Sequence, residues 1–284
     1  MRTVHKSSRI ILYLVLILFA IFYLLPVYVL LATSFKSFAE VSLKDMWKLP
    51  QNISLDSFKI AWRGDTSKGV TGLSKNFMNS IYLVIPATLI SSLLGSMNGY
   101  VFSKWKFKFS NTVLALIIFG MFIPYQSVLI PMVVVLQKIG LYGSIPGLIF
   151  IHCVYGIPIT TLIFRNYYST VPTELLEAAK IDGGGFLRIY KDIMLPISMP
   201  GFAVVMIWQF TSIWNDFLFG LVVAQKPSIQ PITVALNNLA GSYFVEWNIQ
   251  MAGALITAVP PLLLYIFLGR YFMRGLLAGS LSGI

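Results

Sequence analysis

Residues 177–196 read EAAKIDGGGFLRIYKDIMLP, a polar stretch with three consecutive glycines in a very apolar chain. We expect a short helix to begin after Thr173, because threonine is a favoured N-cap residue. Glu174 and Glu177 would then lie in the first turn, where the helix dipole favours carboxylates. The glycines at 183–185 predict that this helix ends in a left-handed turn.

A second short helix is predicted over residues 186–194. Phe186, Tyr190 and Ile193 recur at helical spacing and would share one face of it. Pro196 is expected to end this helix and to begin the next apolar segment. The two helices and the glycine turn would therefore form a small platform between two membrane helices.

The first of these helices carries a compact apolar side made of Leu175, Leu176, Ala178 and Ala179. Such a side could rest on lipid, as interfacial amphipathic helices do. The alanines are smaller than the side chains that favour insertion into lipid, and they allow close approach by another surface. This favours docking of the helix into a groove of another protein.

The whole chain has the composition of an integral membrane protein. It has 284 residues, of which 57% are hydrophobic and 11% are charged. The charged share of a soluble domain is about 25%. Several apolar stretches exceed the roughly 18 residues needed to cross a bilayer. The net charge of +11 is assigned to basic residues at helix ends, which set topology, and no nucleic acid partner is expected.

Six membrane-spanning helices are predicted, at residues 10–33, 77–102, 112–136, 145–164, 197–224 and 251–272. Basic residues cluster in the N-terminal arm, in the loop after the second span and in the tail: Arg2, Lys6, Arg9, Lys104, Lys106, Lys108, Arg270 and Arg274. Both termini should therefore face the cytoplasm. The loop at 34–76 conflicts with this orientation, since it would be external and carries seven Lys/Arg and four acids.

Signatures of catalysis and of metal binding are missing from the sequence. It has no GxxxxGK[ST], HExxH or CxxC motif, so no catalytic residue, cofactor or metal site is expected. The single cysteine, Cys153, and the neighbouring His152 are interpreted as core residues. A formal GxSxG match at 279–283 ends at the last residue, whereas a nucleophile elbow needs a following helix.

Ionisable residues are almost absent from the predicted spans. The exception is Asp216, in the stretch WNDFLFG at 214–220. Placing an acid in the bilayer costs at least about 2.5 kcal/mol, so such residues usually face an interior. Two interpretations stay open. Asp216 pairs with a neighbouring helix or lies near a water-filled boundary, or it takes part directly in a pathway through the membrane.

The opening stretch resembles the EAA motif of membrane subunits of bacterial ATP-binding-cassette (ABC) importers. The matching residues are Glu177, Ala178, Ala179, Gly183, Ile193, Leu195 and Pro196. The stretches 121–141, 214–220 and 271–279 also resemble the maltose-type sugar permeases. The resemblance implies an all-α membrane protein with six transmembrane helices, the type I ABC importer permease fold and a cytoplasmic coupling helix.

This resemblance also implies a division of the chain. Residues 1–72 would hold the N-terminal arm, the first transmembrane helix and an external loop. Residues 73–272 would form the transmembrane domain, with five helices and the EAA loop at 173–196. Residues 273–284 would be a cytoplasmic tail.

The partners follow from the same resemblance. The seven motif residues would couple to a separate ATPase, which binds ATP and magnesium. The assembly would hold a second homologous permease, two ATPase subunits and an extracytoplasmic solute-binding protein in a bacterial cell membrane. The chain would then be no enzyme but half of a path for a sugar, glycoside or polyol.

Candidate residues for the path are Gln126, Asn215 and Asp216. The external loop at 225–250 would contact the binding protein through Asn237, Asn238, Tyr243 and Trp247. In the maltose-type system the partner permease supplies most sugar contacts, so the resemblance assigns no specificity to this chain. Two alternatives remain: an ABC permease for a solute other than a sugar, and an ion-coupled carrier that works alone.

Overall fold

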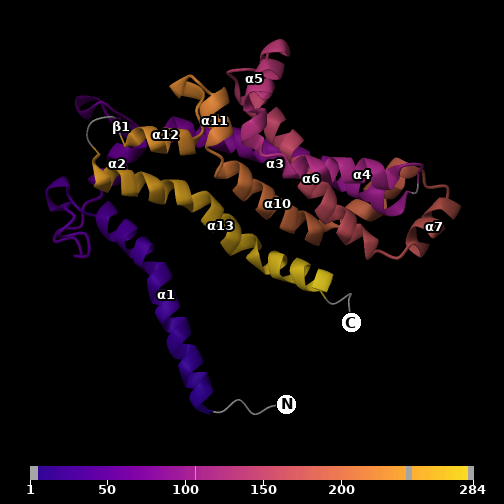
Figure 1. Ribbon diagram of the computed structural model, residues 1–284, viewed down its shortest axis with the longest axis horizontal. Coiled ribbons are helices and arrows are strands. Elements are labelled where there is room, and N and C mark those ends of the chain that lie inside the picture. The colour runs from indigo at the N-terminus through magenta and orange to yellow at the C-terminus, as the bar shows by residue number, and fades with distance from the viewer. Residues whose placement is uncertain (1–5, 106, 241–244, 281–284) are drawn as a thin grey trace. The chain divides into compact units, whose positions relative to one another are not determined.

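The computed structural model describes residues 6–105, 107–240 and 245–280, and helices make up most of it (Figure 1). Within these ranges the only strands are β1 (Gly64–Asp65) and β2 (Val70–Thr71). They form one antiparallel pair in which Gly64 lies opposite Thr71. The prediction of an all-α protein is confirmed.

Four helices in the described residues are long and apolar enough to cross a membrane. They are α1 (Lys6–Ser34), α3 (Ser74–Lys104), α6 (Ile145–Ser169) and α13 (Trp247–Ser280). Two sharply bent helix pairs also qualify, which gives up to six spans if each pair counts as one. This agrees with the predicted number of spans, although two of them are not single straight helices.

The span predicted at 112–136 is the first broken one. It consists of α4 (Ser110–Phe119), η3 (Gly120–Phe122), η4 (Tyr125–Val128) and α5 (Leu129–Lys138), with a bend of 94°. The break lies at Ile123, which is extended with φ −76° and ψ 119°. Pro124 follows it, and a residue before proline is driven out of the helical region. The predicted span is therefore two helices joined at a sharp bend rather than one straight helix.

The span predicted at 197–224 extends beyond one helix, because α10 (Met199–Trp214) ends at residue 214 and α11 (Leu218–Val223) is a separate helix. The platform helix runs through α8 (Phe186–Ile189), the π-helical η5 (Tyr190–Met194) and α9 (Leu195–Ile197). A bend of 77° at Ser198 separates it from α10. Pro196 therefore does not end the helix, contrary to the prediction. It lies in α9, directly after the π-helical turn η5.

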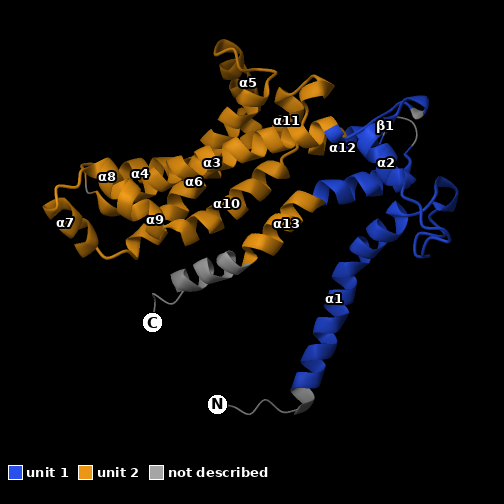
Figure 2. Ribbon diagram, turned by 180° about the vertical axis from the view of Figure 1, so that it is seen from behind, with its two compact units in different colours: residues 1–74, 236–258 blue, residues 75–235, 259–284 orange. Residues whose placement is uncertain are grey.

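The chain divides into two compact units, residues 1–74 with 236–258 and residues 75–235 with 259–284 (Figure 2). In the first unit, α2 (Asp56–Arg63) packs on the first turns of α13, where Ala61, Ile249 and Ala252 are buried together. Asn248 Nδ2 donates a hydrogen bond to Ser57 Oγ at 3.0 Å. Packing and a buried polar contact thus tie the loop at 34–76 to α13.

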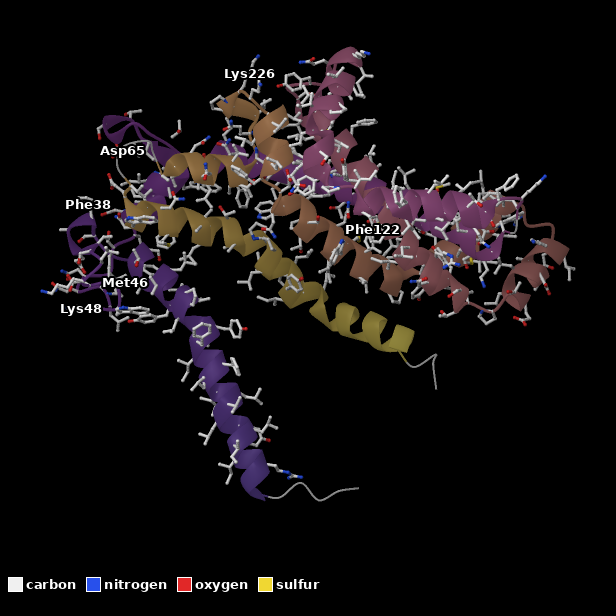
Figure 3. The ribbon with its side chains drawn as sticks, viewed as in Figure 1. Phe38, Met46, Lys48, Asp65, Phe122 and Lys226 are labelled. Atoms are coloured by element: carbon white, nitrogen blue, oxygen red, sulfur yellow. The ribbon has the colours of Figure 1, made fainter. Side chains whose placement is uncertain are left out.

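The rest of that loop is held by local hydrogen bonds. It contains η1 (Phe38–Glu40) and η2 (Thr66–Lys68), and Figure 3 labels Phe38, Met46, Lys48 and Asp65 along it. Lys36 is buried, and its Nζ donates to the carbonyl of Asp45 at 2.8 Å. The N–H of Gln51 donates to the Glu40 carboxylate and lowers the pKa of Glu40. The loop is therefore a folded cap rather than a simple linker.

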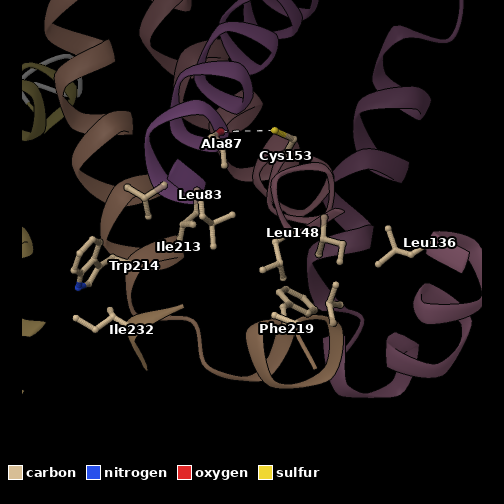
Figure 4. Packing of buried hydrophobic residues seen from close by; sticks show 13 residues of the cluster. Leu83, Ala87, Leu136, Leu148, Cys153, Ile213, Trp214, Phe219 and Ile232 are labelled. Atoms are coloured by element: carbon tan, nitrogen blue, oxygen red, sulfur yellow. Dashed lines mark hydrogen bonds between the residues drawn. The ribbon is translucent and has the colours of Figure 1, made fainter. Parts of the chain in front are cut away.

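The second unit contains the remaining elements. They are α4 to α6, α7 (Glu174–Ile181), α8 to α10, α11 (Leu218–Val223), η6 (Pro227–Ile229), nearly all of α3, the first half of α12 (Ile232–Leu239) and the part of α13 from residue 259 on. Its main cluster of buried residues draws on α3, α5, α6, α10, α11 and α12 (Figure 4). Cys153 lies in this cluster and faces the carbonyl of Ala87 at 3.7 Å. It is a core residue, as predicted.

Glycines bring α3 and α6 into close contact. A Cβ atom built on Gly95 would lie 2.1 Å from Thr160 Oγ1, and one on Gly99 would lie 2.7 Å from the backbone N of Arg165. The two glycines are four residues apart, the small-residue spacing that lets membrane helices approach closely. Thr160 Oγ1 also donates to the carbonyl of Ser91 at 3.1 Å. No larger residue fits at these positions without separating the helices.

We predict that Gly99→Ala lowers the thermal stability of the detergent-solubilised protein. The added methyl group meets backbone atoms of α6 that cannot rotate away, and such overpacking costs about 1–3 kcal/mol. Gly120→Ala is the matched control, since a Cβ there has open space and no positive φ. An equal unfolding temperature for the two variants would contradict this account of the α3–α6 contact.

Candidate functional site

The helix of the opening stretch is α7, and its N-terminus differs from the prediction. Glu174 and Glu177 lie in its first turn, as expected. Thr173 already has helical dihedrals, and its side chain makes no capping hydrogen bond. Its carbonyl instead accepts from the N–H groups of Leu176 and Glu177. Thr173 thus extends the helix through its backbone, and the predicted side-chain cap is wrong.

The glycine turn at the end of α7 forms as predicted. Gly183 has φ +76°. Its N–H donates to the carbonyl of Lys180, and the N–H of Gly184 donates to that of Ala179 at 2.8 Å. These two bonds define a Schellman motif, which satisfies the last carbonyls of a helix. Gly184 is also constrained, because a Cβ there would lie 2.6 Å from the Ala179 carbonyl oxygen.

The apolar side predicted for α7 is in fact two faces. Leu176 is buried, and Ala179 packs against the same cluster. Leu175, Ala178 and Ile181 are exposed, the last of them by 87%. Residues three apart share a helix face, whereas neighbours diverge by about 100°. The prediction that all four residues of 175–179 form one side was therefore wrong.

Aromatic rings hold the turn against the end of α3. Lys180 Nζ lies 4.7 Å from the centre of the Trp105 ring. Phe186, the first residue of α8, contacts Trp105 at 5.2 Å and stacks on Tyr100 at 5.1 Å, measured between ring centres. Cation–π and aromatic contacts of this kind add to the burial of the rings. They fix α7 and α8 relative to α3.

Four buried hydroxyl groups also bind the loop to the membrane helices. We name them the hydroxyl chain, and they belong to Tyr190, Ser96, Tyr168 and Ser198. Tyr190 donates to Ser96 Oγ at 3.0 Å, and Ser96 lies 2.6 Å from the Tyr168 hydroxyl. Tyr168 donates to Ser198 Oγ at 2.9 Å, and Ser198 donates to the Leu195 carbonyl. The chain joins η5 to α3, α6 and the bend before α10. This chain was not predicted from the sequence.

The seven residues of the EAA pattern divide into outward and inward members. Glu177, Ala178, Gly183 and Pro196 are exposed, whereas Ala179, Ile193 and Leu195 are half-buried against the cluster that contains Leu176. In both views of the ribbon, α7 lies at one end of its unit and α5 and α11 at the other (Figures 1 and 2). The loop thus presents one surface outward and rests on the helices with the other.

At the other end of this unit, α6, α10 and α11 surround a cavity of about 600 Å³, which we name the polar cavity. Its lining residues are Tyr125, His152, Tyr155, Gly156, Ile159, Trp208, Gln209, Ser212, Ile213, Asn215, Asp216, Phe217, Leu218 and Phe219. Rings of Tyr125, His152 and Tyr155 each contact the ring of Phe219, with centres 5.1–5.5 Å apart. Polar and aromatic groups therefore meet within the membrane part of the chain.

Asp216 is both paired and part of this lining. Its carboxylate accepts from the N–H groups of Phe219 at 3.4 Å and Gly220 at 3.1 Å, at the N-terminus of α11. This is the position where a helix favours negative charge. Asp216 Oδ2 also lies 3.7 Å from His152 Nε2 on α6. Asp216 is thus held by a neighbouring helix and also lines the cavity. Its direct role in a pathway stays a prediction.

The other predicted path residues are placed differently. Asn215 lines the polar cavity, whereas Gln126 is exposed on η4 and its neighbour Tyr125 is the lining residue. His152 was predicted as a core residue, and Gln209 was not predicted as a path residue. The spacing in the sequence could have indicated this lining, because residues three or four apart share one helix face. The lining residues follow this interval at 152, 155, 156 and 159 on α6 and at 209, 212 and 216 from α10 onward.

The predicted contacts to a binding protein lie in the loop at 225–250, which is largely structured. Asn237 and Asn238 are exposed on α12, and Trp247 begins α13 and is 51% exposed. Tyr243 lies outside the described residues. The start of the loop, where Figure 3 labels Lys226, is anchored to α3 by the side-chain amides of Asn76 and Asn79, which donate to carbonyls at 227–230.

We predict that Tyr168→Phe loosens the platform helix without unfolding the protein. The variant removes the central hydroxyl and leaves Ser96 and Ser198 short of a partner, at a cost of about 1–3 kcal/mol. Backbone amides at 186–197 should exchange with deuterium faster than in the wild type. Tyr155→Phe is the control, since Tyr155 is not in the hydroxyl chain, and equal exchange in both variants would contradict the prediction.

Comparison with known proteins places the chain in a family. Residues 87–277 match the family described as binding-protein-dependent transport system inner membrane component. The chain is 46% identical to the probable ABC transporter permease protein PH1216 of Pyrococcus horikoshii, over 98% of both chains. It is 33% identical to the glucose import system permease protein GlcU of Saccharolobus solfataricus, over 98% of this chain and 96% of that protein.

Another relative and a solved structure support the same family. The melibiose/raffinose/stachyose import permease protein MelC of Bacillus subtilis is 32% identical over 98% of both chains. A crystal structure of a bacterial ABC transporter for import of the acidic polysaccharide alginate contains a chain with the same fold. The TM-score is 0.81 at 19% identity, over 96% of this chain and all of that one. This chain therefore belongs to the binding-protein-dependent inner membrane component family and is a permease subunit of an ABC transporter.

Proposed function

We propose that this chain is one permease subunit of an ATP-driven importer for a sugar, glycoside or polyol. The observation that carries the proposal is the arrangement of the loop at 173–196. Its outward surface is free to receive a partner, while its inward surface is bonded to the membrane helices. ATP and magnesium would bind to a separate ATPase, whose closure moves the loop.

The outward surface of α7 has the chemistry of a docking helix. Leu175, Ala178 and Ile181 form an exposed apolar strip, and Glu177 is exposed beside it. Amphipathic helices bind in grooves of partner proteins through such strips. An apolar groove with a basic residue near Glu177 would be complementary to it. This fits a role of Glu177 and Ala178 in contact with the ATPase.

The inward surface would carry force from the ATPase to the membrane. Leu176 and Ala179 pack on the buried cluster, and Tyr190 enters the hydroxyl chain. A displacement of α7 would therefore reach α3 and α6 through packed and hydrogen-bonded groups. Ile193 and Leu195 contribute to the same contact, and Gly183 sets the angle between the two helices of the loop.

The remaining partners complete the proposed assembly. The most apolar window of α1, within residues 9–34, has no buried residue in this chain, which suits contact with lipid or with a second homologous permease. Two ATPases would act from the cytoplasmic side. A solute-binding protein would dock outside, near Asn237, Asn238 and Trp247. The division into a first part at 1–72, a transmembrane domain at 73–272 and a tail at 273–284 belongs to this proposal.

The class of solute is inferred from relatives. GlcU is named for glucose, MelC for melibiose, raffinose and stachyose, and XacI of Haloferax volcanii for xylose and arabinose. A methionine importer shares only the fold, with a TM-score of 0.51 at 17% identity. The relatives come from archaea and bacteria, so we propose the cytoplasmic membrane of a prokaryote, with both termini inside.

The proposal can be tested by co-purifying the complex in mild detergent and reconstituting it in liposomes with its binding protein. We expect uptake of D-glucose, D-xylose or melibiose that requires ATP, and no uptake of L-methionine. Uptake driven by a proton or sodium gradient without the ATPase would instead support a carrier that works alone. Uptake of L-methionine alone would overturn the sugar class.

We predict that Glu177→Ala weakens binding of the ATPase about tenfold and lowers ATP-driven uptake with it. A hydrogen bond to a charged group contributes about 1.5–3 kcal/mol. The control is Asp192→Ala, which removes another exposed acid of the same loop that lies outside the EAA pattern. Full ATPase binding and coupled uptake in Glu177→Ala would show that this residue has no coupling role.

We further predict that Gly183→Ala reduces coupling while the subunit remains assembled. A left-handed backbone costs a residue with a Cβ roughly 1–2 kcal/mol, so the turn should shift and α7 with it. Gly185→Ala is the control, since its φ is −76° and a Cβ there has open space. The measurement is sugar taken up per ATP hydrolysed, and an unchanged ratio in Gly183→Ala would contradict the prediction.

A further inference from the structure

The polar cavity offers a binding site that the resemblance to sugar permeases does not assign to this chain. We infer that it is a subsite for the hydroxyl groups of a neutral sugar or polyol, with His152 and Asp216 as its polar centre. The inference deepens the proposed function and rests on it for the class of solute. It differs from the expectation that a partner permease supplies most sugar contacts.

His152 carries the strongest argument. Its side chain is buried, with 6% of the residue exposed, and its Nε2 atom has no hydrogen-bond partner. Nearly all buried polar side-chain atoms in proteins have a partner, so an unpaired one that lines a cavity calls for an explanation. Asp216 Oδ2 is 3.7 Å away, which is beyond hydrogen-bond distance. The two atoms therefore face each other without a direct hydrogen bond.

A hydroxyl group has the chemistry to complete this arrangement. It can donate its proton to the Asp216 carboxylate and accept a hydrogen bond from the N–H of a neutral His152 imidazole. The Asp216 carboxylate already accepts two backbone N–H groups, and it has lone pairs for one more donor. One hydroxyl would thus satisfy both side chains at once.

The rest of the lining suits a polyhydroxylated solute. Gln209, Ser212 and Asn215 supply further hydrogen-bonding groups, and Trp208 and Tyr155 supply aromatic faces. A sugar ring has both hydroxyl groups and an apolar face, so it can use both kinds of surface. The volume of about 600 Å³ lies within the usual range for small-molecule sites.

The polar cavity does not face lipid. Ser212 and Asn215 are exposed in this chain, and Asp216 is partly exposed beside them. Acidic residues within spans face an interior or a water-filled space rather than lipid. The cavity therefore opens toward water or toward the interface with a partner, where a solute in transit would pass.

A metal cation fits the site less well than a hydroxyl does. Among the described residues, no group of three or more His, Cys, Asp and Glu side chains could hold a metal ion. Asp216 is the single acid of the lining, and its carboxylate is already used by the N-terminus of α11. The lining thus favours a neutral solute.

The test uses the complete importer, purified without its binding protein so that only the membrane subunits bind sugar. Cys153→Ala removes the single cysteine of this chain, and Ser212→Cys then places a thiol in the lining of the cavity. We expect D-glucose, D-xylose or melibiose to slow alkylation of the new thiol by a maleimide. L-Methionine at the same osmolality should not slow it.

His152→Ala in this background should raise the sugar concentration that gives half-protection about tenfold, since a hydrogen bond to the solute is lost. Thr88→Ala is the matched control. It removes another buried side chain without a hydrogen-bond partner, on α3 and outside the cavity, and it should leave that concentration unchanged. His152→Gln should restore part of the protection, because an amide can again bond to the hydroxyl.

Monodeoxy analogues of D-glucose locate the contact. The analogue without the contacted hydroxyl should protect equally poorly whether the protein with Cys153→Ala and Ser212→Cys keeps His152 or carries His152→Ala. Equilibrium binding of radiolabelled D-glucose to the same complexes is a second readout that does not depend on alkylation. It should show the same shift of about tenfold.

The inference would be overturned if His152→Ala left protection and binding unchanged. It would also be overturned if an importer that takes up sugar with ATP showed neither protection nor binding. Equal protection by L-methionine would overturn it as well. A complex that binds sugar through His152 but shows no ATP-driven uptake would support the subsite while the proposed function fails. The two results are thus separable.

Discussion

The close contact between α3 and α6 is the constraint on which the rest of the larger unit depends. Gly95 and Gly99 leave no room for a side chain against Thr160 and the backbone of Arg165. In a bilayer, lipid tails are as apolar as the helices, so packing and hydrogen bonds decide which helices associate. This contact sets the register in which Ser96 meets Tyr168 and in which His152 reaches the polar cavity.

The loop at 173–196 illustrates how a short segment can be both exposed and firmly attached. One face of α7 and the aromatic residues near Trp105 bind to the ends of α3 and α6, while the other face stays free. The π-helical turn at η5 lies between the loop and the bend at Ser198. Such turns are frequent at functional sites, and here the turn places Tyr190 against Ser96. A partner that binds the free face would therefore act on the membrane helices through a defined set of contacts.

The polar cavity lies at the other end of the same helices. α6 contributes Tyr168 to the hydroxyl chain and His152 to the cavity, and α10 runs from the bend at Ser198 to Asn215. The two sites are thus ends of shared rigid elements. A change in the angle between α6 and α10 would alter the spacing of His152 and Asp216. This gives a physical route by which events at the loop could change the affinity of the cavity for a solute.

The sequence by itself determined the membrane class, the apolar segments, the position of the polar loop and the left-handed turn at Gly183. These features are local: they follow from apolar length, from glycine and from the spacing of a short motif. Only the tertiary structure decided the bend at Ser198, which face of α7 is buried, the hydroxyl chain and the meeting of His152 with Asp216. Each of these depends on how separate helices pack against one another. Contacts such as Ser96 with Tyr168 join residues 72 positions apart, and no local pattern fixes the register that brings such residues together.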